Sequence, residues 1–123
     1  MIEAYFTEIE QTIQEFPYIR FLSLTKKTYN ATQGYISGSI IFENSHRLDF
    51  VEVKNTDYQN KVKYRYHYMN EHQQIIFRYD NVPHHANVST FPHHKHERQE
   101  NNVVASPEVN LSLVLLEIAQ YQR

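Results

Sequence analysis

The chain has 123 residues, 41% of them hydrophobic, and a net charge of −2, which together indicate one globular domain over residues 1–123. The mildly acidic balance disfavours general electrostatic binding to nucleic acid, which usually needs a basic surface. The absence of cysteine excludes disulfides, thiolate metal sites and cysteine nucleophiles. We expect a cytoplasmic protein without membrane contact, because the N-terminal residues do not resemble a signal peptide and no apolar run could span a bilayer.

An amphipathic helix is predicted over residues 2–16. Apolar side chains recur there at helical spacing, on the face formed by Ile2, Tyr5, Phe6, Ile9, Ile13 and Phe16. Pro17 ends the helix, since the residue before a proline is disfavoured in the α conformation. The apolar period then changes from helical spacing to strict alternation, which predicts five strands, over residues 18–29, 35–43, 47–55, 61–69 and 74–80. Their short connections indicate an antiparallel meander of about five strands.

The clearest alternation lies in residues 61–69, where tyrosines alternate with basic residues. The tyrosines Tyr64, Tyr66 and Tyr68 are predicted to pack in the core. The opposite face carries four polar residues, Lys61, Lys63, Arg65 and His67. Such a face often meets only solvent, but this one could also bind the phosphates of RNA.

A second helix is predicted after Ser106, which would be its N-cap, with Pro107 at the first helical position. Its apolar residues cover more than one narrow stripe: Leu111, Leu113, Val114, Leu115, Leu116 and Ile118. The helix should therefore pack on the sheet or on a partner chain, such as a second copy in a homodimer. Two helices and one antiparallel sheet define an α+β fold of two layers.

An irregular segment, residues 81–105, separates the last predicted strand from this helix. Five of the eight histidines fall within it: His84, His85, His93, His94 and His96. If the segment is extended, His94 and His96 share one face, while Lys95 points to the other. The cluster could be structural, with its rings packed on tyrosines, or it could serve chemistry.

One chemical interpretation is a metal site. A His-x-His pair on a strand can bind one Zn²⁺, and the ligands would be His94, His96 and His84. His85 and Asp80 are further candidates for the third ligand. The cation of Lys95 and the scarcity of nearby carboxylates oppose this interpretation.

The interpretation that we favour is cleavage of RNA without a metal or other cofactor. Such a reaction needs a base for the 2′-hydroxyl, an acid for the leaving oxygen and cations for the phosphorane. Histidine titrates near neutrality, and His94 and His96 would be the base and the acid. Lys95 and Arg78 would hold phosphate, and Asp80 would orient a histidine. The remaining predicted residues are His84 and His85 as catalytic groups and Tyr79, His93, Arg65 and Lys63, with Asp80, as substrate contacts.

Two linked motifs resemble the TumE family of small prokaryotic toxins. They are R-Y-D-x-x-P-H-H at residues 78–85 and F-P-H-H-K-H at residues 91–96, followed by VVASPEVNLSLVLLEI. The resemblance covers roughly residues 35–120. It implies a toxin of a two-gene toxin–antitoxin module that inhibits growth through RNA, and a cognate antitoxin with a helix-turn-helix domain. A protein that only holds a partner chain is the alternative without catalysis.

The chain departs from its relatives directly after the second motif. Relatives often continue as H-H-K-H-x-G, whereas this chain reads HHKHERQENN without a glycine. A tight turn there with a positive φ would have to use Asn101 or Asn102 instead.

Overall fold

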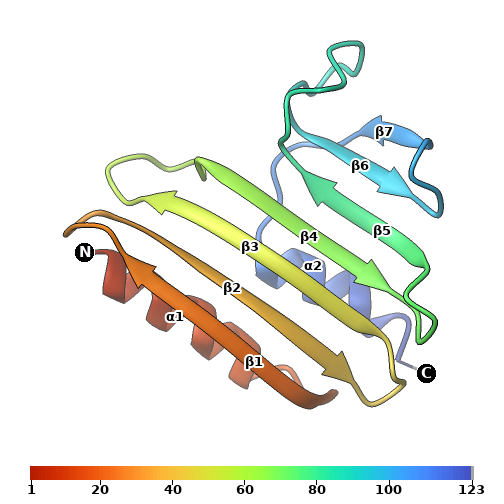
Figure 1. Ribbon diagram of the computed structural model, residues 1–123, viewed down its shortest axis with the longest axis horizontal. Helices are drawn as coiled ribbons and strands as arrows, with labels where there is room; N and C mark the ends of the chain where they lie inside the picture. The colour runs from red at the N-terminus through yellow and green to blue at the C-terminus, as the bar shows by residue number, and fades with distance from the viewer. Residues whose placement is uncertain (123) are drawn as a thin grey trace.

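The computed structural model describes residues 1–122 and has the predicted α+β architecture. In chain order the elements are α1 (Ile2–Gln14), β1 (Ile19–Thr28), β2 (Gln33–Phe42), β3 (Arg47–Asn55), β4 (Lys63–Met69), β5 (Ile75–Asp80), β6 (His94–Glu97), β7 (Val103–Ala105) and α2 (Leu111–Ala119). The strands form one antiparallel meander in sequence order (Figure 1). Among residues 1–122, no helix has both the length and the apolar character needed to cross a membrane.

The sheet has seven strands, so the prediction of about five was too low. The two additional strands, β6 and β7, lie inside the segment that was interpreted as irregular. They are four and three residues long, and an alternation over so few positions is too short to recognise. Pro83 and Pro92 lie in the loop before β6, where they do not interrupt pairing.

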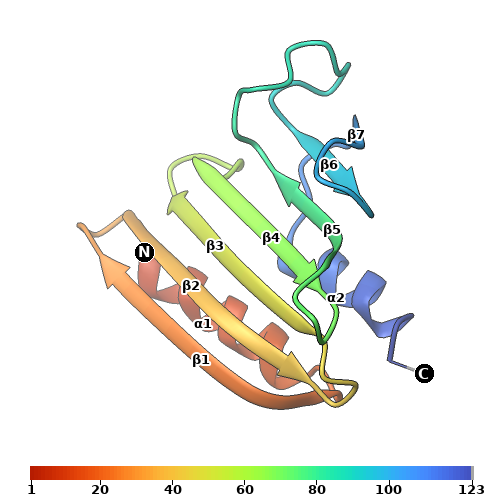
Figure 2. The same ribbon diagram turned by 45° about the vertical axis from the view of Figure 1, so that its right-hand side comes forward.

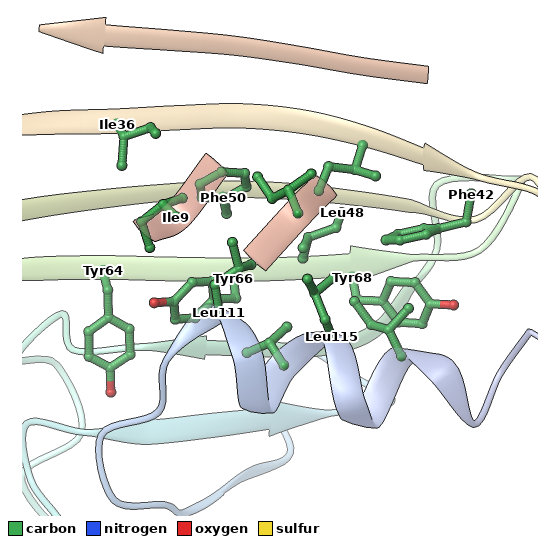
Figure 3. Packing of buried hydrophobic residues seen from close by; sticks show 14 of the residues in the cluster. Ile9, Ile36, Phe42, Leu48, Phe50, Tyr64, Tyr66, Tyr68, Leu111 and Leu115 are labelled. Atoms are coloured by element: carbon green, nitrogen blue, oxygen red, sulfur yellow. The ribbon is translucent and has the colours of Figure 1, made fainter. Parts of the chain in front are cut away.

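Both helices lie on the same side of the sheet (Figures 1 and 2). The core between these layers holds buried residues of both helices and of β2 to β5. Figure 3 shows Leu111 and Leu115 of α2 beside Tyr66 and Tyr68 of β4. All three alternating tyrosines of β4 are fully buried, which confirms that they belong to the core.

The phenol groups of the core find polar partners. Tyr5 and Tyr66 both donate hydrogen bonds to the carboxylate of Glu52, which is completely buried on β3. The Tyr64 hydroxyl lies 3.0 Å from His93 Nδ1. Large aromatic side chains can therefore fill this core without leaving their hydroxyl groups unpaired.

The second helix begins at Leu111, later than predicted, and its N-cap is Asn110 instead of Ser106. The Asn110 side chain accepts a hydrogen bond of 2.8 Å from the Leu113 amide, as a capping side chain does. Ser106 Oγ donates instead to the carbonyl oxygen of Pro107. Residues 106–110 thus form a connection without regular secondary structure, and α2 packs on the sheet.

The two faces of the sheet separate the residues of β5 and β6. Phe77 and Tyr79 point toward α2, where the Tyr79 hydroxyl bonds Glu117 Oε1 at 2.6 Å. Because side chains alternate along a strand, Arg78 and Asp80 point to the face away from the helices. The site described next lies on that face.

Candidate functional site

The pairing of β5 with β6 places two histidines beside the motif arginine and aspartate. His96 lies opposite Arg78 and His94 lies opposite Asp80, and paired residues share a face. The expectation that His94 and His96 point the same way is confirmed.

These residues line an open cavity of about 260 Å³, which we call the histidine pocket. Its lining residues are Arg65, Arg78, Asp80, Val82, His84, His85, His94 and His96. Asp80, His94 and His96 form its floor, with only 3%, 1% and 4% of their surfaces exposed. The polar groups of the floor are therefore held by contacts within the protein.

The loop between β5 and β6, at the top of Figure 1, brings His85 to these two imidazoles. Its ring centre lies 4.8 Å from that of His94 and 5.5 Å from that of His96. The rings of His94 and His96 are 4.9 Å apart. Three imidazoles thus meet at one point, and the third comes from His85, while the exposed His84 lies at the rim.

Both ring nitrogens of His94 face oxygen atoms. Its Nδ1 lies 2.9 Å from the carbonyl oxygen of Pro92, and its Nε2 lies 2.9 Å from Asp80 Oδ1. A carbonyl oxygen and a carboxylate only accept hydrogen bonds, so Nδ1 carries a proton, and Nε2 stands at ion-pair distance from the carboxylate. A protonated His94 would form a close ion pair with Asp80 at this distance.

His96 differs from His94, because one of its ring nitrogens faces a hydrogen-bond donor. Its Nδ1 donates to the carbonyl oxygen of Glu100 at 2.7 Å, while its Nε2 lies 3.2 Å from Arg78 Nη2, which can only donate. Nε2 therefore keeps its lone pair. Burial, assisted by the charge of Arg78, lowers the pKa of His96, which agrees with a neutral ring.

Arg78 and Asp80 connect the two imidazoles. Arg78 Nε lies 3.2 Å from Asp80 Oδ2, and Arg78 Nη1 lies 2.6 Å from Glu100 Oε1. The backbone amide of Val82 donates to Asp80 Oδ1 at 3.0 Å. The carboxylate is thus fixed by a guanidinium, an imidazole and an amide, and the guanidinium faces the pocket from the side of His96.

Four predicted site residues lie outside the pocket, and three of them lie on the helix side of the sheet. Lys95 Nζ lies 2.9 Å from Glu117 Oε2 of α2, and Tyr79 bonds the same carboxylate group. The ring of His93 stacks on Tyr64. Lys63 is exposed on the pocket side of β4, two residues before Arg65, but does not line the pocket.

Sequence reasoning missed the backbone groups that orient the histidines. The carbonyl oxygens of Pro92 and Glu100 fix the two Nδ1 atoms, and the side chain of Glu100 holds Arg78. Carbonyl oxygens occur at every residue, so no residue type marks such contacts. The choice of His85 over its neighbour His84 likewise depends on the conformation of the loop.

The fold and the pocket define a small α+β protein with a cationic histidine pocket on the face of its sheet away from the helices. The chain belongs to the TumE family, whose model, described as Toxin TumE, matches residues 6–122. This match confirms the resemblance of the motifs and covers nearly the whole chain, and it indicates a toxin-like role. Comparison with curated proteins and with solved structures finds no match.

Proposed function

We propose that this protein is the toxin of a prokaryotic toxin–antitoxin module and that it cleaves cytoplasmic RNA in the histidine pocket without a metal ion. The observation that supports this proposal is a pair of buried imidazoles in which Nε2 of His96 faces Arg78 and Nε2 of His94 faces Asp80. A neutral imidazole can accept a proton, a charged one can donate it, and a guanidinium stabilises the phosphorane.

In the proposed reaction, His96 is the general base and His94 the general acid. Arg78 moves its hydrogen bond from His96 Nε2 to the phosphate, which is the stronger acceptor. The freed Nε2 takes the proton of the 2′-hydroxyl, and the 2′-oxygen attacks phosphorus. The bond from phosphorus to the 5′-oxygen breaks while His94 Nε2 protonates that oxygen. The products are a 2′,3′-cyclic phosphate and a 5′-hydroxyl end.

The proposed phosphate contacts differ from those predicted. Lys95 is bound to Glu117 on the other face, so Arg65 takes its place beside Arg78. Lys63 would bind a neighbouring phosphate along β4. His84 and His85 border the pocket and would contact the same nucleotide.

A direct test is incubation of the purified chain with bulk RNA in the presence of EDTA. We expect cleavage with 2′,3′-cyclic phosphate ends, and a loss of about 10²-fold or more in His94→Asn and in His96→Asn, as for a missing acid or base. His72→Asn is the matched control, because this histidine is exposed in the turn between β4 and β5. An inert wild-type chain, or full activity in the double variant, would contradict the proposal.

The proposed partner is the cognate helix-turn-helix antitoxin. On α2, Leu113 and Leu116 are 53% and 66% exposed beside a groove that Phe16 and Tyr18 also line. These exposed leucines favour a second candidate function, a non-catalytic interaction protein or homodimer. A well-folded chain that leaves RNA intact in the test above would put this candidate first.

A further inference from the structure

We propose that the histidine pocket also binds one divalent transition-metal ion, through His85, His94, His96 and Asp80, and that the bound ion inhibits the pocket. The binding part stands by itself, whereas the inhibition rests on the proposed function. The ligand set differs from the zinc site considered from sequence, because His85 replaces His84 and a carboxylate is added.

The four side chains already converge. One ligand nitrogen from each of His85, His94 and His96 lies within 4.8 Å of the others. Asp80 Oδ1 lies 2.9 Å from His94 Nε2, and Asp80 Oδ2 lies 3.7 Å from His96 Nε2. Zinc–nitrogen bonds of 2.0–2.1 Å place tetrahedral ligand atoms about 3.3 Å apart. The imidazoles would therefore need to approach one another by at most about 1.5 Å, on the same geometry.

Two of the imidazoles are oriented as metal ligands are. A metal-binding histidine usually donates its other ring N–H to a carbonyl oxygen or carboxylate, which fixes the tautomer. His94 and His96 each make this bond through Nδ1, to the carbonyl oxygens of Pro92 and Glu100. In both rings Nε2 is left as the ligand atom, and in both it is turned toward Asp80.

The third imidazole, that of His85, contacts the other two rings without a hydrogen bond to either. Within residues 1–122, no hydrogen bond involves a ring nitrogen of His85, which lies on the loop between β5 and β6. Its ring can therefore turn toward an ion without losing a partner. The main opposition comes from Arg78, whose hydrogen bond to His96 Nε2 has to break, but Arg78 keeps its bond to Glu100.

Metal binding and the proposed RNA chemistry exclude one another at the level of atoms. Coordination occupies the Nε2 lone pair of His96, which the proposed base needs, and replaces the Nε2 proton of His94, which the proposed acid donates. An ion that holds all four side chains therefore removes both proton-transfer groups at once. The expected consequence is inhibition that a chelator reverses.

The binding test uses the full chain, purified without a histidine tag and stripped with EDTA. After dialysis it is titrated with Zn²⁺ in competition with a chromophoric chelator. We expect one ion per chain and an affinity at least about ten-fold weaker in His85→Ala and in His94→Ala. His84→Ala is the matched control, since it removes the adjacent histidine of the same loop and should leave the zinc affinity unchanged.

Circular dichroism of each variant separates loss of a ligand from loss of the fold. His85→Ala is the decisive variant, because its half-buried loop side chain should be dispensable for folding. The metal site would be overturned if the wild type did not bind one Zn²⁺ per chain. It would also be overturned if the wild type, His85→Ala and His94→Ala bound Zn²⁺ with equal affinity.

Addition of one equivalent of Zn²⁺ to the RNA assay tests the inhibition. Loss of cleavage that EDTA restores supports the full inference, and unchanged cleavage by the zinc-bound chain overturns the inhibitory part. A chain that binds zinc as described but never cleaves RNA would retain the metal site, while the proposed function and its inhibition would both fall.

Discussion

At the scale of single residues, Asp80 joins the two sides of the histidine pocket. It is almost fully buried, and its two oxygens contact His94, Arg78 and the amide of Val82. A buried carboxylate needs such partners, because an unpaired charge in the interior is strongly destabilising. Its position agrees with the predicted role of orienting a histidine, and that role stays a prediction until RNA cleavage is measured.

Arg98 occupies the position after the second motif at which relatives often have a glycine. The motif H-H-K-H-x-G aligns its glycine with Arg98, and this residue has a φ of 67°. The expectation that Asn101 or Asn102 would take the positive φ was wrong. The turn between β6 and β7 has the left-handed conformation at the position where relatives often carry glycine, and the Arg98 amide donates to the carbonyl oxygen of Ile76 there.

We therefore predict that Arg98→Gly is more stable than Arg98→Ala by about 1 kcal/mol, since only glycine adopts a positive φ without steric cost. Both variants remove the guanidinium that lies 5.8 Å from the centre of the Tyr121 ring, so this contact cancels in the comparison. Urea denaturation of the two variants gives the difference. Equal stabilities would show that Arg98 is not strained.

At the scale of elements, the short strand β6 positions two of the histidines that form the pocket. Four residues carry two histidines to one face and Lys95 to the other. Lys95 bonds Glu117 and so attaches the edge of the sheet to α2. The same alternation that aligns His94 with His96 excludes Lys95 from their pocket, which is why the proposed phosphate contacts use Arg65 in its place.

The start of α2 gives a second test at this scale. Asn110→Ala should lower the free energy of unfolding by about 1 kcal/mol, because the Leu113 amide loses its capping partner. Ser106→Ala is the matched control, and we expect a smaller loss, since its hydroxyl bonds only the neighbouring Pro107 carbonyl. Thermal or urea denaturation measures both. A larger loss in Ser106→Ala would favour the helix start predicted from sequence.

At the scale of the whole molecule, both helices cover one face of the sheet and leave the other to the polar residues of β4, β5 and β6. His67, Arg78 and His96 lie side by side there in successive strands. Burial lowers the pKa of His67 and of His96, and also that of His46. The folded chain thus holds several histidines in their neutral form.

These lowered pKa values predict a pH-dependent stability. The unfolded chain takes up protons below a pKa of about 6.5, which the folded histidines resist. Their contribution is therefore complete above about pH 6.5 and is lost as the pH falls through the lower folded pKa values. His67→Asn should flatten the slope below about pH 6.5 by at most about 1.4 kcal/mol per pH unit.

Urea denaturation of the wild type and His67→Asn across this pH range measures the slope. His72→Asn serves as the control, because this side chain is exposed in the turn between β4 and β5. An unchanged slope in His67→Asn would contradict the neutral state of this half-buried ring.

The sequence by itself determined the elements that are long enough to show a periodic apolar pattern, and it determined the residues of the two motifs. Helical spacing predicted α1, alternation predicted β1 to β5 and the common face of His94 and His96, and the two motifs indicated the family. These features are local, because each depends only on how a helix or strand orients successive side chains.

Only the tertiary structure decided which groups meet. The sheet register brought Asp80 to His94, and the loop fold chose His85 over His84. Backbone carbonyls, which the sequence does not mark, fixed both Nδ1 atoms. Such contacts join segments that are separated along the chain, so their geometry depends on how the whole sheet and its loops pack, and local spacing cannot predict it.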